Sequence, residues 1–196
     1  MSEEGLNQNP VLRTFMLALI DAGATAFVET GTLWGDTCLW ITKRRPSVPI
    51  YTCEVNPKAI AVSRDKFVSY DQIHSYSMSS EKFIPFIADE LGDLPIFYLD
   101  AHWGTYWPIL DELHAIGVHH HYAYIVIHDF QVPGIPGDQG QFDKLNAEYI
   151  RPALSPNHTY SMFYPSRHIP GKSGFAVLFQ NAVPIIDPDE FTQGDL

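Results

Sequence analysis

The distribution of apolar and polar positions along the chain predicts a protein in which strands and helices alternate. Short apolar runs between polar or glycine-rich turns are typical of buried strands, and apolar residues that recur every three or four positions are typical of helices. The apolar runs predict seven strands, at 26–30, 49–55, 73–78, 95–100, 122–130, 159–164 and 174–180. Helical spacing predicts helices over 11–22, 36–44, 58–70, 79–91, 108–117 and 142–154.

The order of these elements predicts the fold class. Five strands alternate with helices, and two more close the chain without a long helix between them. This order predicts an α/β protein with a doubly wound, mostly parallel sheet of seven strands whose last strand is reversed. A length of 196 residues suits one domain. We expect its core over about 11–180 and a surface arm over the proline- and acid-rich segment 181–196.

Composition narrows the choice of partner. The chain has 12 Lys and Arg against 23 Asp and Glu, a formal net charge of -11, which opposes nucleic-acid binding and favours a small-molecule partner. Cys38 and Cys53 are spaced like buried side chains rather than like a metal or disulfide framework. The N-terminal residues lack the features of a signal peptide, and no apolar run is as long as a membrane span. We therefore expect a cytoplasmic protein that does not contact membranes.

The segment Phe27–Thr37, FVETGTLWGDT, carries the first candidate chemistry. It places Glu29, Gly31 and Gly35 at the carboxyl end of the first predicted strand. In open α/β sheets ligands bind in the crevice at this edge. The spacing, ExGxxxG, differs from the GxGxxG of dinucleotide-binding turns, and two bulky residues stand where a pyrophosphate would lie. The pattern therefore argues against NAD(P).

The same turn, with Glu54 closing the second strand, resembles the class I S-adenosylmethionine-dependent methyltransferases. The resemblance covers about 15–180 and implies a Rossmann-like sheet and S-adenosylmethionine as the cofactor. It also implies cofactor-binding roles for particular positions: the first motif at Glu29, Gly31 and Gly35, the ribose hydroxyls at Glu54, the adenine at Ser79 and the fourth-strand motif at Asp100.

Acids and histidines follow the fourth and fifth predicted strands. Asp100 and His102 come after the fourth, and His128 and Asp129 close the fifth. Neighbouring parallel strands lie about 4.8 Å apart, so these side chains can converge. We predict His102, His128 and Asp129 as catalytic residues. The pairing resembles the macrocin and mycinamicin O-methyltransferase group, which implies Asp100 and Asp129 as ligands of a divalent metal, although His128 replaces the first acid of that group's pair.

Three uses of this cluster remain open. A metal held by Asp100 and Asp129 would lower the pKa of an acceptor hydroxyl. Magnesium prefers oxygen ligands, whereas two histidines and a carboxylate suit iron, zinc or manganese. Alternatively, His102 or His128 acts as a general base without metal. In the third use, the side chains only hydrogen-bond the backbone of nearby loops.

The function predicted from these features is methyl transfer from S-adenosylmethionine to a hydroxyl of a small-molecule acceptor. A metal-dependent oxygenase with a two-histidine, one-carboxylate triad and a cofactor-binding module without turnover are the alternatives. The acceptor pocket is expected among four aromatic residues, Trp34, Trp103, Tyr106 and Trp107. The N-terminal region is too short to form a large lid over the site. We therefore expect either the loop 131–141 or a second subunit of a homo-oligomer to cover it. The run 119–121, three histidines, is expected to be a solvated turn.

Overall fold

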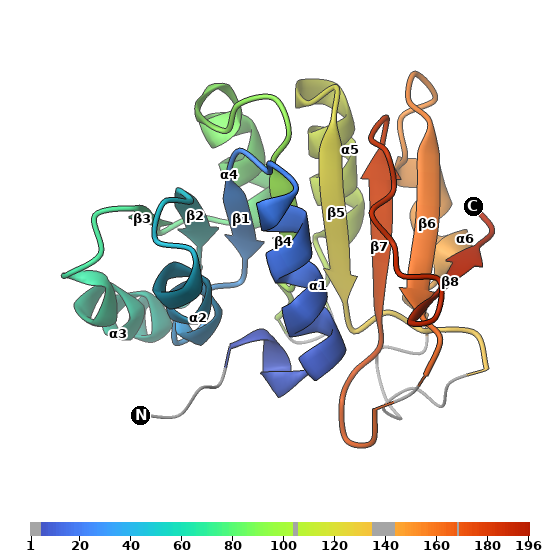
Figure 1. Cartoon of the computed structure of the whole chain (residues 1–196). Helices are drawn as coiled ribbons and strands as arrows, with labels where there is room; N and C mark the ends of the chain where they lie inside the picture. Colours follow the sequence, from blue (N-terminus) through green and yellow to red (C-terminus); the bar gives the residue numbers. More distant parts are fainter. Residues whose placement is uncertain (1–4, 104–105, 135–143, 168) are drawn as a thin grey trace.

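The computed structural model describes residues 5–103, 106–134, 144–167 and 169–196, and its core is one eight-stranded sheet with helices on both faces (Figure 1). The strands are β1 Phe27–Thr30, β2 Ile50–Cys53, β3 Ile73–Tyr76, β4 Ile96–Leu99, β5 Ala123–His128, β6 Tyr160–Pro165, β7 Phe175–Gln180 and β8 Phe191–Gly194. The α-helices are α1 Pro10–Asp21, α2 Asp36–Arg44, α3 Pro57–Phe67, α4 Ser80–Ile87, α5 Ile109–His119 and α6 Ala147–Ile150.

Local sequence signals explain where two of the helices begin. The side chain of Asn9 accepts a hydrogen bond from the backbone N–H of Leu12, and Pro10 opens α1. Asn56 caps α3 in the same way, and Pro57 is its first residue. An asparagine cap satisfies an N–H that has no partner within the helix, and proline at the first position loses no hydrogen bond.

The strand order is β3-β2-β1-β4-β5-β7-β6-β8. Strands β1 to β5 run parallel, and β7 runs antiparallel to β5. This confirms the doubly wound, mostly parallel sheet with a reversed seventh strand. The direction in which successive strands are added changes between β1 and β4, so the carboxyl ends of these two strands flank the topological switch point. Their last residues are Thr30 and Leu99.

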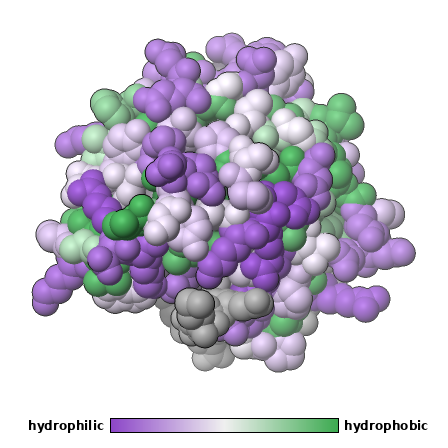
Figure 2. Space-filling model, turned by 60° about the vertical axis from the view of Figure 1, so that its left-hand side comes forward, coloured by the Kyte–Doolittle hydropathy of each residue, from purple (hydrophilic) through white to green (hydrophobic). Residues whose placement is uncertain are grey.

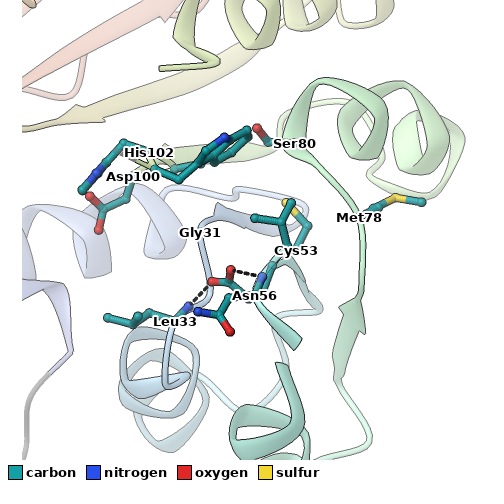
Figure 3. Close-up of a pocket in the computed structure, with 12 residues that line it drawn as sticks. Gly31, Leu33, Cys53, Asn56, Met78, Ser80, Asp100 and His102 are labelled. Atoms are coloured by element: carbon teal, nitrogen blue, oxygen red, sulfur yellow. Dashed lines mark hydrogen bonds between the residues drawn. The ribbon is translucent and has the colours of Figure 1, made fainter. Parts of the chain in front are cut away.

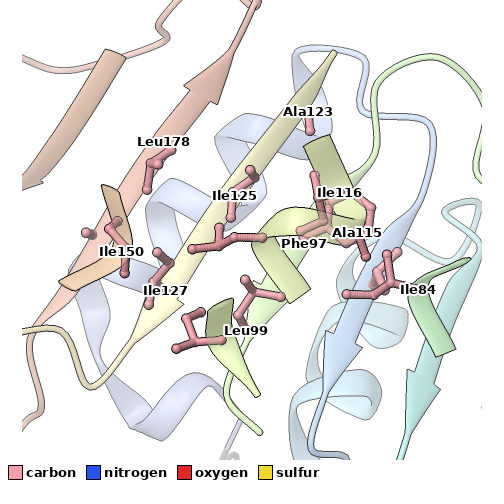
Figure 4. Close-up of a cluster of buried hydrophobic side chains, with 14 of the residues drawn as sticks. Ile84, Phe97, Leu99, Ala115, Ile116, Ala123, Ile125, Ile127, Ile150 and Leu178 are labelled. Atoms are coloured by element: carbon pink, nitrogen blue, oxygen red, sulfur yellow. The ribbon is translucent and has the colours of Figure 1, made fainter. Parts of the chain in front are cut away.

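Each buried strand contributes side chains to two separate cores. Along β5, Ile125 and Ile127 pack on the face that α4, α5 and α6 cover (Figure 4). Tyr124 and Val126 point to the opposite face, beneath α1 and α2. Successive side chains of a strand alternate between faces, so a sheet covered on both sides needs an uninterrupted apolar strand. The apolar run at 122–130 meets this requirement.

The C-terminal segment corrects one prediction. Residues 191–194 form β8, which pairs antiparallel with β6, so the sheet has eight strands and this part of the segment is not a surface arm. Phe191 is 5% exposed, and its ring centroid lies 4.7 Å from that of Phe15 and 6.1 Å from that of Phe175. One large aromatic side chain thus anchors a segment whose overall composition is polar.

The helix expected over 142–154 is also different. Residues 142 and 143 lie outside the described part of the chain, and the helix that follows covers only Ala147–Ile150. It continues as a 3-10 turn over Arg151–Ala153, which contains Pro152. Proline lacks the N–H that an α-helix interior needs, which explains the early end.

The surface is polar on the face that carries α2 and α3. Figure 2 shows hydrophilic and intermediate residues over most of this face, with hydrophobic residues in isolated patches. Within the described ranges, none of the helices combines the length and the apolar character that a membrane crossing requires.

Candidate functional site

The turn after β1 lies directly against the turn after β4. Gly31 has a φ of 81°, and a Cβ added to it would lie 3.0 Å from both the Cα of Ala101 and the backbone oxygen of Asp100. The backbone N–H groups of Gly31 and Thr32 donate to the carbonyl of Cys53. A glycine is therefore required here both for its backbone conformation and for the close approach of the two turns.

Gly35, the second glycine of the predicted first motif, lies away from the cavity walls. Its φ is 77°, and a Cβ there would meet the ring of Phe67. It stands directly before the first residue of α2 and is absent from the walls of the cavities described below. The absence of a side chain at Gly35 thus lets the turn before α2 approach Phe67 and Ser63 of α3 closely.

Glu54 faces a cavity at the switch point. One carboxylate oxygen accepts from the backbone N–H of Leu33 at 2.9 Å, and the other accepts from that of Asn56 at 2.8 Å (Figure 3). An ionised carboxylate has about four acceptor positions, so two remain for a ligand. The cavity has a volume of about 270 Å³, and its wall also includes Gly31, Cys53, Val55, Met78, Ser80, Asp100, Ala101, His102 and Trp103.

Glu29 faces a second, adjoining cavity of about 460 Å³. The two cavities share four wall residues: Gly31, Leu33, Asp100 and His102. Glu54 and Glu29 therefore lie on either side of this shared wall. The side chain of Glu29 is 2% exposed. Burial raises its pKa to about 8, against the opposing effect of its hydrogen bonds.

Two neutral side chains hold the carboxyl group of Glu29. The thiol of Cys38 donates to its Oε2 at 2.9 Å, and the hydroxyl of Thr52 lies 3.3 Å from the same atom. Cys38 is absent from the predicted site residues. Its position in the sequence could have suggested a contact with Glu29, because Cys38 lies nine residues later, at the start of the helix that follows the turn.

Ser79 does not line either cavity. It occupies the N-cap position of α4, and its side chain makes no capping hydrogen bond. Its neighbours Met78 and Ser80 lie in the wall of the first cavity instead. The hydroxyl of Ser80 is buried and has no hydrogen-bond partner within the described residues. The structure therefore brings the two neighbours of Ser79, rather than Ser79 itself, to the wall of this cavity.

The predicted strand-end cluster does assemble. Nδ1 of His128 lies 2.8 Å from Oδ1 of Asp100 and 3.2 Å from Oδ1 of Asp129. Burial opposes the charged form of His128 and by itself would lower its pKa. The negative charges of Asp100 and Asp129 and their hydrogen bonds to the ring outweigh burial, and they raise the pKa of His128 to about 10. Asp129 has a φ of 56°, an uncommon conformation for a non-glycine residue and one that is concentrated at functional sites.

The donor set of this cluster bears on the metal question. One ligand atom from each of Asp100, His128 and Asp129 lies within 4.8 Å of the others. An imidazole nitrogen and two carboxylate oxygens suit manganese, iron or zinc better than magnesium, which prefers oxygen alone. His102 is not a member of this group, so the described residues do not bring together the two-histidine triad that the oxygenase alternative requires.

His102 lies where three cavities meet. It lines both cavities described above and a smaller inner pocket between the carboxyl ends of β4 and β5. Asp100 shares all three walls, and His128 and Asp129 line the second cavity and the inner pocket. The three predicted catalytic residues therefore face connected spaces.

Glu112 lies in the wall of the inner pocket and is absent from the predicted site residues. It is 1% exposed, and burial raises its pKa to about 7. Its Oε1 has no hydrogen-bond partner within the described part of the chain. The sequence could have indicated that Glu112 is buried, because it lies on the apolar stripe of α5 between Ile109 and Ile116.

The aromatic residues do not form a single pocket. Trp103 lines the first cavity, Trp34 the second and Trp107 the inner pocket, while Tyr106 packs its ring 4.8 Å from that of Trp103.

The histidine run at 119–121 is not a solvated turn throughout. His120 is 6% exposed and lies against Phe97. Burial lowers the pKa of His120 to about 4, so it is a neutral core residue.

Comparisons with known proteins identify the fold of the chain but not its family. No protein-family model matches the chain, and no curated protein matches it. Solved structures do match. An O-methyltransferase from Bacillus cereus in complex with SAH superimposes with a TM-score of 0.60 at 15% identity, covering 88% of this chain and 81% of that one.

Two further structures agree. The cofactor-bound protein Rv0187 from MTB has a TM-score of 0.60 at 20% identity, with 90% of this chain and 82% of that one covered. A protein from Staphylococcus aureus provisionally named as a caffeoyl-CoA O-methyltransferase has a TM-score of 0.60 at 11% identity, with coverage of 88% and 84%. At these identities, the likeness establishes that the chain has the fold of these proteins.

Proposed function

We propose that the protein transfers a methyl group from S-adenosylmethionine to a hydroxyl of a small-molecule acceptor. The proposal is supported by two adjoining cavities at the switch point of the sheet, where ligands of this fold class bind. The likeness to an O-methyltransferase crystallised with SAH, S-adenosylhomocysteine, favours the same ligand class for this chain.

The observation that carries the proposal is the placement of Glu54. Its carboxylate is fixed at the cavity wall by the N–H groups of Leu33 and Asn56, beside the glycine turn at Gly31. A fixed carboxylate with two unused acceptor positions suits the two adjacent hydroxyls of a ribose. In the proposal Glu54 binds the ribose, and Glu29 faces the amino-acid end in the second cavity.

The methyl donor, when bound, supplies a methyl group already activated by its positive sulfur. The protein's contribution is then positioning, exclusion of water and removal of one proton. We assign proton removal to His102, because it lies where the two donor cavities meet the inner pocket. The ring of His102 would accept the proton that the acceptor hydroxyl loses when its oxygen takes the methyl group from the donor. Asp100, His128 and Asp129 orient the acceptor.

The same three residues would hold a divalent ion if the reaction uses one. Asp100 and Asp129 would supply oxygen ligands and His128 a nitrogen, and the ion would lower the pKa of the acceptor hydroxyl. Without an ion, the contacts of His128 with Asp100 and Asp129 hold the same three side chains together.

Binding of SAH measured by calorimetry tests the proposal. We expect Glu54→Ala to bind SAH about one hundredfold more weakly than the native protein, because two charge-assisted hydrogen bonds are lost. Asp65→Ala, which removes an exposed acid from α3, is the matched control and should bind normally. Absence of SAH binding by the native chain, or equal binding by Glu54→Ala, would refute the cofactor assignment. Tight SAH binding without turnover on a broad panel of hydroxylated acceptors would instead favour a cofactor-binding module.

A further inference from the structure

The loop between β6 and β7, residues 166–174, extends beyond the carboxyl end of β5, at the lower edge of Figure 1. Residue 168 lies outside the described part of the chain. The loop carries two basic residues, Arg167 and Lys172, followed by Ser173. None of these three is among the residues assigned above to the donor or to the catalytic cluster, so the loop raises a separate question.

Backbone contacts hold the loop beside the catalytic cluster. The N–H of Phe130 donates to the carbonyl of Gly174 at 3.0 Å, and a Cβ at Gly174 would collide with the carbonyl oxygen of Phe130. Ser173 lines the second cavity together with Asp129. The residue directly before Ser173 is Lys172, so the basic end of the loop begins one residue from the wall of the catalytic site.

Arg167 and Lys172 face a shallow cavity of their own. Its wall also includes Asn9, Pro165, Ile169, Ser173 and Gly174. Because Ser173 belongs both to this wall and to the wall of the second cavity, the two spaces adjoin. Asn9 is 4% exposed and caps α1, so a rigid helix start forms the side of the cavity opposite the loop. The cavity lined by the two cations and the second cavity, which His128 and Asp129 line, therefore meet at Ser173.

In the part of the chain that the structure describes, no acidic side chain pairs with Arg167 or Lys172. Two other cations of this acidic chain do form ion pairs, Arg45 with Asp21 and Lys66 with Asp36. Within the described ranges, neither the Arg167 nor the Lys172 side chain makes a hydrogen bond or an ion pair. Two unneutralised cations beside one cavity repel each other and attract an anion.

We propose that Arg167 and Lys172 bind the phosphate group of a phosphorylated acceptor. A phosphate monoester carries a charge of about -2 near neutral pH, which matches two cations, whereas a carboxylate matches one. The fork of the Arg167 guanidinium pairs with two oxygens, and the Lys172 ammonium adds a mobile charge. The phosphate site itself does not depend on the identity of the methyl donor, but its place in an acceptor site rests on the proposed function.

Inorganic phosphate is the probe for this site. It is titrated into the full chain, with and without SAH and at constant ionic strength, while the backbone amide signals of residues 171–174 are followed by NMR. We expect saturable shifts in the native protein and binding at least about tenfold weaker in the double variant Arg167→Gln, Lys172→Gln, because charge-assisted hydrogen bonds are lost. The control, Lys43→Gln with Arg151→Gln, removes the same net charge from exposed residues elsewhere and should bind phosphate normally.

Each outcome decides the proposal. Acetate serves as a carboxylate probe and should bind more weakly than phosphate. The proposal is overturned if phosphate produces no saturable shift, if the control variant loses binding equally, or if acetate binds as tightly. SAH binding by the double variant should match that of the native chain. Phosphate binding in a protein that fails to bind SAH would retain the phosphate site and reject the methyltransferase assignment.

Discussion

The two halves of the site are built in different ways. On the side proposed to bind the methyl donor, called the donor side, Glu54 is held by backbone N–H groups, and Glu29 by a thiol and a hydroxyl. On the side proposed to bind the acceptor, called the acceptor side, the ionisable groups of Asp100, His128 and Asp129 hold one another. The donor side therefore depends on local backbone geometry, while each member of the acceptor cluster depends on the charge of the others.

This difference has a consequence for substitutions. Truncating the side chain of Glu54 or Thr52 on the donor side removes a contact and leaves the backbone that positions its neighbours, whereas a substitution at Gly31 disturbs that backbone itself. Changing one residue in the cluster leaves a partly buried charge without its counter-charge, which costs more than the lost contact itself. Four predictions test the distinction.

The largest effect is expected where the donor side depends on backbone geometry. We expect Gly31→Ala to lower the free energy of unfolding by about 2–4 kcal/mol, because it combines a left-handed conformation with a contact against rigid backbone. Urea denaturation measures the change. Gly23→Ala is the control, since Gly23 also has a positive φ but nothing within 4 Å of an added Cβ. Equal losses in the two variants would mean that the close approach to Ala101 is unimportant.

The second prediction concerns the free energy of unfolding as a function of pH. Glu29 on the donor side and His128 on the acceptor side should change it over different pH ranges. Glu29 has a folded pKa of about 8 against an ordinary value of 4.5, so the folded state holds an extra proton between these values and loses stability as the pH rises through them. For His128 the corresponding window runs from 6.5 to about 10. Each slope should reach up to about 1.4 kcal/mol per pH unit.

Unfolding by urea across pH 5 to 9.5 separates the two contributions. Glu29→Gln should flatten the acidic part of the profile, and His128→Gln the alkaline part. A profile for Glu29→Gln that parallels the native one below pH 6.5 would show that the carboxyl group of Glu29 is ionised in the folded protein.

The third prediction compares coupling energies. In a double-mutant cycle, Asp100→Asn and His128→Asn should be non-additive by about 1–3 kcal/mol, because their side chains form one charged cluster. Glu54→Gln and His128→Asn should be additive within about 0.5 kcal/mol, since no contact joins them within the described residues. Strong coupling in the second pair would contradict the independence of the two halves.

The smallest effect is expected from a neutral donor-side contact. The hydroxyl of Thr52 lies 2.6 Å from that of Thr32 and 3.3 Å from Glu29. Thr52→Val keeps the shape of the side chain and removes its hydrogen bonds, so we expect a loss of about 1 kcal/mol in urea denaturation. Ser47→Ala, at an exposed turn position, provides the baseline for a lost hydroxyl. A loss above that of Gly31→Ala would reverse the order of these predictions.

Much of the fold was accessible from local pattern. Helix α2 has the predicted bounds, Asp36–Arg44, and each of the seven predicted strands overlaps an observed one. Glu29, Glu54 and Asp100 stand at cavity walls because a strand's end determines where the next side chains point. Two predictions from the sequence pattern were wrong because a single residue decided the local structure. Phe191 packs into the core and makes β8 part of the sheet, and Pro152 ends α6 early.

By itself, the sequence determined which residues stand at the carboxyl ends of strands, since apolar periodicity and turn residues act over a few positions. Only the tertiary structure decided which of these groups meet. The contact between His128 and Asp100 joins residues 28 positions apart, and it exists because β4 and β5 are neighbours in the register that aligns Leu99 with Ile127. Tertiary packing likewise decided that the thiol of Cys38 bonds Glu29 and that burial raises the pKa of Glu112, because the cost of a buried carboxyl depends on everything packed around it.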